Sequence, residues 1–192
     1  MRRKLYDKLL AWKEESQGKT AILIEGARRV GKSYIAEEFA KENYKSYIII
    51  DFSKVNNSVK DLFEQYLDDL DTFFMLLSAY FSIELYPRES LIIFDEVQLF
   101  PRARAAIKHL VADGRYDYIE TGSLISIKEN IKDILIPSEE EHIKMYPLDF
   151  EEFLWAIGDT TLMPAIKKCL KIRSLLVNCY IERRWMFLDN IC

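Results

Sequence analysis

Two glycines, a lysine and a serine are spaced in residues 26–33 in a pattern that can hold a chain of phosphates. The residues read GARRVGKS and fit G-x-x-x-x-G-K-[ST]. In this pattern the glycines let the backbone curl, so that several N–H groups point at an anion. Lys32 is then expected to reach the β- and γ-phosphates of a nucleotide, and the Ser33 hydroxyl to ligate Mg²⁺. The predicted nucleotide-binding residues are Gly26, Ala27, Arg28, Arg29, Val30, Gly31, Lys32, Ser33 and Tyr34.

Two adjacent carboxylates, Asp95 and Glu96, end a second apolar run, which reads LIIFDE. Asp95 is expected to hold Mg²⁺, directly or through water. Glu96 should turn to the other side of the strand, where it can activate an attacking water as a general base. Nucleotide kinases typically lack this second carboxylate, so the pair favours hydrolysis. The alternative is that Glu96 only solvates the end of the strand.

A third polar group stands in YIETGS, at residues 118–123. A hydroxyl at the end of a neighbouring strand could orient the lytic water or sense the γ-phosphate. Thr121 and Ser123 both qualify, and the sequence does not choose between them; an ordinary turn is the alternative. The predicted catalytic residues are therefore Lys32, Glu96, Thr121 and Ser123.

The elements that must position these residues alternate between apolar strands and amphipathic helices. Strands that are apolar throughout are typical of a parallel sheet covered on both faces. The sequence therefore predicts a three-layer α/β fold of the P-loop type, with a mostly parallel sheet and a short helical C-terminal tail. The strands are expected at residues 21–26, 46–52, 90–96, 116–123 and 142–148, and the main helices at 3–16, from 32, after 101 and at 149–158.

The composition changes near the C-terminus. Residues 1–158 are expected to form the P-loop domain, whereas residues 159–192 carry six Lys and Arg against three acids and all three cysteines. This basic tail is predicted to be helical and could be a separate element or the remnant of a C-terminal domain.

The totals exclude several classes of protein. The chain of 192 residues carries a net charge of −4, which argues against coating nucleic acid through bulk charge. Three cysteines fit neither a closed disulfide framework nor a zinc pattern, so a reduced, cytoplasmic compartment is expected. The longest apolar run, residues 73–83, is too short to cross a bilayer, so no membrane association is predicted.

Taken together, GARRVGKS, IIIDF, IIFDEVQLFPRA, ETGS and MYPLDFEEFLWAIG resemble the AAA-type P-loop ATPases of bacteria and archaea, in the archaeal-ATPase-like group. The resemblance covers residues 1 to about 158. It implies ATP binding and Mg²⁺-dependent hydrolysis, with nucleotide at the phosphate-binding loop, the metal at Asp95 and water activated by Glu96. Gln98 belongs to the DEVQ pattern, with no role assigned.

Two departures from that family affect turnover. Many relatives carry a Gly-Arg pair before the fifth strand, whose arginine acts on a neighbouring subunit's nucleotide, but here the region reads LIPSEEEHIKMYPL. Arg102 and Arg104 could substitute for it, or could simply begin a solvated helix. The helical lid or C-terminal domain of relatives is absent or reduced to the basic tail.

The sequence therefore predicts an ATPase that turns over slowly unless a partner completes its site. The alternative is a nucleotide-gated module that binds a protein or DNA partner with little or no turnover. Assembly into an oligomer is compatible with both.

Overall fold

The computed structural model describes residues 3–123 and 140–173, which group into two compact units. The first is Lys4–Pro147; the second combines Met1–Arg3 with Leu148–Cys192. The elements of the first unit are α1 (Lys4–Ser16), β1 (Ala21–Gly26), α2 (Lys32–Asn43), β2 (Ser46–Asp51), α3 (Asn57–Gln65), α4 (Leu70–Phe81), β3 (Ser90–Asp95), the 3₁₀ helix η1 (Val97–Leu99), α5 (Pro101–Asp113), β4 (Asp117–Ser123) and β5 (Glu140–Met145).

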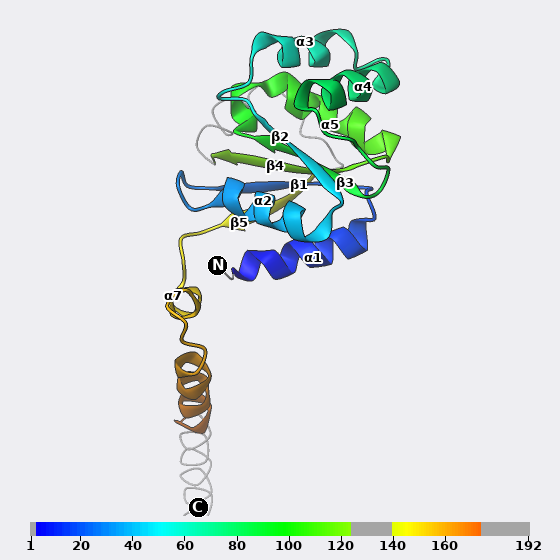
Figure 1. The fold of residues 1–192 in the computed structure, drawn as a ribbon. Coiled ribbons are helices and arrows are strands. Elements are labelled where there is room, and N and C mark those ends of the chain that lie inside the picture. The colour runs from blue at the N-terminus through cyan, green and yellow to red at the C-terminus, as the bar shows by residue number, and fades with distance from the viewer. Residues whose placement is uncertain (1–2, 124–139, 174–192) are drawn as a thin grey trace, which may run out of the picture. The chain divides into compact units, whose positions relative to one another are not determined.

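A five-stranded sheet in the order β2-β3-β4-β1-β5 forms the centre of the first unit (Figure 1). Every neighbouring pair of strands is parallel. The predicted parallel α/β fold is confirmed. In such a sheet the carboxyl ends of all strands meet at one edge, and this edge brings the loop after β1 close to the residues that end β3 and β4.

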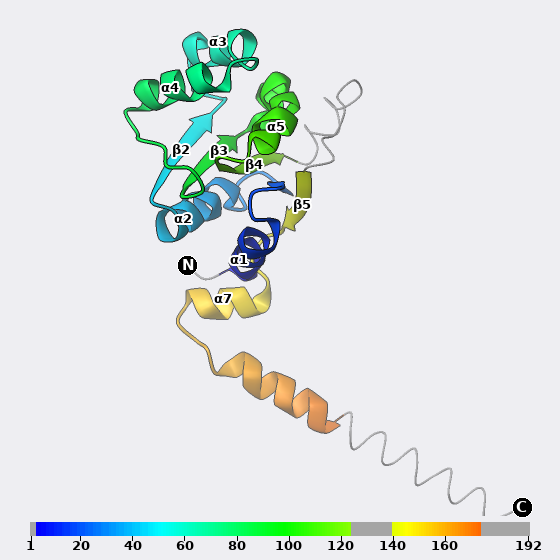
Figure 2. The same ribbon diagram turned by 90° about the vertical axis from the view of Figure 1, so that its right-hand side faces the viewer.

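Helices cover both faces of the sheet, as the edge-on view in Figure 2 shows. Helices α3, α4 and α5 pack on one face and α1 and α2 on the other. Alternation along β1 explains how one strand serves both cores, because Leu23 faces α5 and its neighbours Ile22 and Ile24 face α2. All three side chains are fully buried, which is why the strand reads as a continuous apolar run.

The fifth strand differs from its predicted position. It occupies Glu140–Met145 instead of 142–148, in register with β1 from Ala21 opposite Glu140 to Gly26 opposite Met145. The two acidic residues Glu140 and Glu141 thus belong to the strand, which the apolar pattern of the sequence does not indicate. Glu140 is in fact buried, where Arg104 neutralises its charge.

The second unit contains the helix α7 (Phe150–Ala156) and a further helical stretch at residues 162–173. Asp149 and Glu152 form a capping box that begins α7. Arg3 pairs with Glu152 at 3.2 Å, with both side chains buried. The domain boundary predicted at residue 158 stays a prediction. Within the described ranges, no helix combines the length and apolar character needed to cross a membrane.

Candidate functional site

The loop between β1 and α2 is shaped by its two glycines, for different reasons. Gly31 has a φ of 96°, in the left-handed region that glycine adopts without strain, and begins α2. Gly26 is needed for close packing, since a Cβ there would lie 2.2 Å from the backbone oxygen of Met145 in β5. The loop is therefore held between helix and edge strand in a conformation that a side chain at either position would disturb.

Lys32 directs its ammonium group back into this loop. Its Nζ donates to the carbonyl oxygen of Ala27 at 2.9 Å and to that of Gly26 at 3.3 Å. Burial lowers the pKa of Lys32, whereas the negative charges of Glu96 and Asp95 oppose that shift. A buried ammonium held only by neutral carbonyls would gain strongly from an anion placed in the loop.

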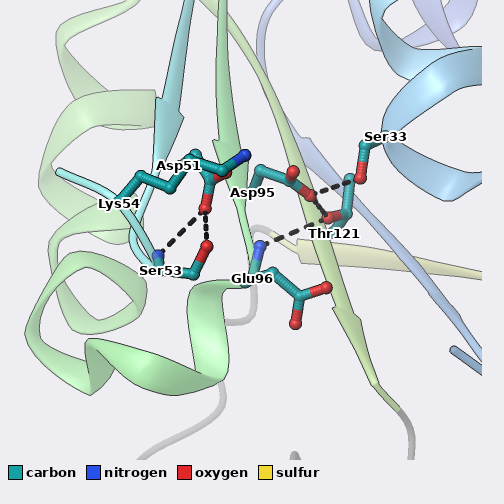
Figure 3. Close-up of polar contacts among 7 residues, drawn as sticks. All are labelled: Ser33, Asp51, Ser53, Lys54, Asp95, Glu96 and Thr121. Atoms are coloured by element: carbon teal, nitrogen blue, oxygen red, sulfur yellow. Dashed lines mark hydrogen bonds and ion pairs between the residues drawn. The ribbon is translucent and has the colours of Figure 1, made fainter.

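Three oxygen-bearing side chains from different elements meet at the carboxyl edge of the sheet (Figure 3). Ser33, at the start of α2, donates its hydroxyl to Asp95 Oδ1 at 2.7 Å. The Thr121 hydroxyl donates to the same carboxylate oxygen from the neighbouring strand β4. Asp95 is buried, so these contacts fix its orientation. The structure thus brings together Ser33, Asp95 and Thr121, which the sequence placed 62 and 26 residues apart.

Glu96 leaves the strand in a different direction from Asp95 (Figure 3). Its backbone is left-handed, with φ 55° and ψ 43°, a conformation that costs a non-glycine residue about 1–2 kcal/mol. Its N–H donates to Thr121 Oγ1 at 3.4 Å, and its carboxylate accepts a hydrogen bond from Gln98 Nε2. Such backbone strain persists where the surrounding structure fixes it, often at functional sites.

Thr121 and Ser123 occupy the same strand, but they differ in what they contact. Thr121 touches both members of the acidic pair, as donor to Asp95 and as acceptor from Glu96. Ser123 is buried at the end of β4, opposite Gly26. The geometry therefore favours Thr121 over Ser123 as the hydroxyl that contacts the acidic pair, and the predicted role toward water or the γ-phosphate stays a prediction.

The remaining predicted loop residues are more exposed. Ala27, Arg28 and Arg29 lie on the surface, and Tyr34 is 52% exposed on the first turn of α2. Arg28 lies near enough for its charge to lower the pKa of Lys32. The backbone of residues 27–29 forms part of the loop, and their side chains are exposed.

A further acidic residue, Asp51, ends β2 directly beside Asp95. The two are in register, and the Phe52 N–H donates to the Asp95 carbonyl oxygen at 3.0 Å. Burial acts to raise the pKa of Asp51, but hydrogen bonds from Lys54 and Ser53 hold it below its usual range. The sequence left open whether Asp51 reaches the site; in the structure it is bound to Lys54 at the edge of the site.

The expectation that Arg104 begins a solvated helix is wrong. Arg104 is buried and donates to both carboxylate oxygens of Glu140, at 2.8 and 3.3 Å. It is therefore not available as a substitute for an arginine finger. Arg102 is exposed at the start of α5 and donates to the carbonyl oxygens of Phe63 and Glu64.

The donor set suits Mg²⁺. This cation prefers hard oxygen ligands and is usually held by one or two protein groups together with substrate phosphates. The Ser33 hydroxyl and the Asp95 carboxylate supply such oxygens 2.7 Å apart, beside a loop built for an anion. No group of three or more His, Cys, Asp or Glu that could bind a metal by itself occurs among the residues the structure describes. A magnesium held jointly with a nucleotide fits the residues present.

The chain is similar to several known proteins. A family model described as an AAA domain matches residues 18–154. Two similar solved structures are a Walker-type ATPase of Pyrococcus abyssi and PCH-2 of C. elegans. The first is 18% identical, with a TM-score of 0.45 over 88% of this chain and 62% of that chain. The second is 17% identical, with a TM-score of 0.42 over 77% and 42%. The chain thus spans less than two thirds of either neighbour, and no curated protein matches it.

Proposed function

The chain belongs to the AAA domain family, and from this premise we propose that it binds ATP with Mg²⁺ and hydrolyses the nucleotide to ADP and phosphate. The observation that carries the proposal is the convergence of Ser33 and Thr121 on one oxygen of Asp95. This convergence lies beside a loop that already holds a buried ammonium group.

The loop would bind the triphosphate through its backbone N–H groups and through Lys32. At present the Lys32 ammonium is satisfied by two carbonyl oxygens, which are weaker partners than a phosphate oxygen. If a phosphate oxygen replaced the two carbonyl oxygens, its negative charge would stabilise the charged ammonium and oppose the effect of burial, which lowers the pKa of Lys32. Binding and positioning of the phosphates account for much of catalysis in phosphoryl transfer, because little covalent chemistry is required.

Ser33 and Asp95 would hold the magnesium, as their 2.7 Å contact already places two oxygen ligands together. The bound cation supplies charge neutralisation at the phosphate oxygens. The Thr121 hydroxyl would keep the Asp95 carboxylate oriented by donating to it. The same hydroxyl accepts the Glu96 backbone N–H and so links the positions of Asp95 and Glu96.

Glu96 is proposed as the general base that orients and polarises the attacking water. It projects away from the Asp95 carboxylate, so that one carboxylate serves the metal and the other remains for water. Glu96 also raises the pKa of Lys32 more than Asp95 does, which is consistent with a carboxylate facing the loop.

Two substitutions test these roles. Lys32→Ala should abolish ATP binding measured by calorimetry with Mg²⁺, whereas Lys8→Ala, on the exposed side of α1, should leave it unchanged. Glu96→Gln should keep binding and lose phosphate release, with Glu64→Gln, at an exposed position of α3, as its matched control. Binding retained in Lys32→Ala, or phosphate release unchanged in Glu96→Gln, would contradict the assignment.

A nucleotide-gated binding module is the second candidate function. The burial of Arg104 against Glu140 favours it, because this contact removes one of the two arginines that could have substituted for the missing arginine finger. In that case ATP would order the domain for a protein or DNA partner. Turnover that stays near background with and without DNA, although ATP binds, would support the module; stimulation by DNA or by a protein partner would support the ATPase.

A further inference from the structure

Gln98 is the last residue of the DEVQ sequence, and its side chain belongs neither to the strand nor to the apolar core. It lies in η1, immediately after the acidic pair, and is only 6% exposed. Its amide Nε2 donates to Glu96 Oε2. Burying a polar amide costs free energy, and here the buried amide donates to a carboxylate only two residues away. This cost favours a functional reason for the contact.

The backbone around this contact is fixed on both sides. The Leu99 N–H donates to the Glu96 carbonyl oxygen at 2.9 Å, and the Phe100 N–H donates to that of Val97 at 3.1 Å. The left-handed conformation of Glu96 begins this turn. The two Cα positions are therefore set by the 3₁₀ helix, and the hydrogen bond then restricts the remaining rotatable bonds of the Glu96 side chain.

The chemistry of the donor suits a base. A lysine or arginine in this place would form an ion pair with Glu96 and reduce its ability to take a proton from water. A neutral amide restrains the carboxylate while adding no charge. The contact is made to Oε2 and does not involve Oε1.

We propose that Gln98 is a positioning residue that holds the Glu96 carboxylate toward the nucleotide site through its Nε2–Oε2 hydrogen bond. The inference rests on the proposed ATPase function and adds the group that orients the base. Without this restraint the carboxylate would sample several rotamers, and a misplacement of about 1 Å can lower a rate about 100-fold.

The test separates turnover from nucleotide binding. Gln98→Met keeps the length of the side chain and removes the donor; Gln98→Glu keeps the shape and places a like charge against Glu96. In both variants kcat should fall about 10-fold to 100-fold, while the calorimetric Kd for ATP with Mg²⁺ stays within about twofold of the wild type. Thermal unfolding of each variant shows whether the fold is retained, and the second variant serves where the first does not fold.

A double-variant comparison distinguishes positioning from a structural role. In the Glu96→Gln background, Gln98→Met should cause no further loss of kcat, because the carboxylate that it orients is already gone. A loss of equal size in that background would overturn the proposal. So would a change in Kd with unchanged kcat, or a rise in kcat, which would mean that Gln98 restrains Glu96 away from its working position.

The wild type separates the failure of this inference from failure of the function itself. If the wild-type chain releases phosphate and Gln98→Met does so equally well, only the role of Gln98 is overturned. If the wild type binds ATP and releases no phosphate, hydrolysis and the role of Gln98 are overturned together, and the nucleotide-gated module stands.

Discussion

Replacement of Arg104 by methionine should destabilise the protein strongly although the residue lies outside the nucleotide site. The Arg104 and Glu140 side chains are 4% and 0% exposed and are joined by two hydrogen bonds. Removal of one partner from a buried ion pair leaves an uncompensated charge and typically costs about 3–5 kcal/mol. Glu120 in β4 is fully buried, and its burial together with the negative charge of Glu140 raises its pKa, which favours the protonated, neutral form and adds no charge that could replace Arg104.

Equilibrium urea unfolding of Arg104→Met measures this cost. Arg102→Met is the matched control, because Arg102 is exposed and donates only to carbonyl oxygens, so its loss should cost about 0.5–1.5 kcal/mol. The double variant Arg104→Met with Glu140→Met should recover most of the loss, since an apolar replacement of a whole buried pair is often neutral or stabilising.

The result that refutes this reasoning is equally definite. A loss below about 1 kcal/mol for Arg104→Met would mean that water or His142, whose Nε2 lies 2.9 Å from Glu140 Oε1, compensates Glu140. A double variant no more stable than Arg104→Met would mean that the arginine contributes through packing and not through charge. A fall in phosphate release at unchanged stability would return Arg104 to the group of candidates for the missing arginine.

Three further predictions concern single positions. Burial raises the pKa of Glu120 well above 4.5, so the folded chain retains a proton that the unfolded chain releases. The free energy of unfolding should therefore fall as pH rises above about 4.5. Glu120→Gln should flatten this dependence in urea titrations at several pH values. Gly26→Ala should lower stability by about 1–3 kcal/mol in thermal unfolding and weaken ATP binding, because the new Cβ meets the Met145 oxygen. Thr121→Val should lower kcat in a phosphate-release assay, because it removes the hydroxyl that contacts the acidic pair. Ser123→Ala should leave kcat near the wild-type value. Equal effects of the two variants would show that the end of the strand matters and not the hydroxyl of Thr121.

Much of this fold could be predicted because its signals are local. The apolar run at 21–26 and the glycine-lysine pattern that follows it fix β1, the loop and the start of α2 within a few consecutive residues. Gly114 ends α5 in the left-handed conformation expected of a helix terminus. The meeting of Ser33 with Asp95 then follows from parallel strands whose carboxyl ends share one edge.

The features that could not be predicted depend on pairs of residues far apart in the chain. Arg104 and Glu140 each look like surface residues in their own helix or strand, and their contact with each other offsets the cost of burying both charges. The close approach of Gly26 to Met145 is set by the register between two strands, which a single sequence does not reveal. The bond from Gln98 to Glu96 required a 3₁₀ turn that no apolar periodicity indicates.

The contact between Gly26 and Met145 has a practical consequence for recombination of this protein with its relatives. A chimaera that exchanges the segment carrying β5 imports a new backbone against the phosphate-binding loop, even though the loop itself is untouched. A shift of the imported strand by one residue would turn its side chains to the opposite face and change the atoms that lie against Gly26 and Gly31. Crossover points should therefore keep β1, its loop and β5 from a single parent.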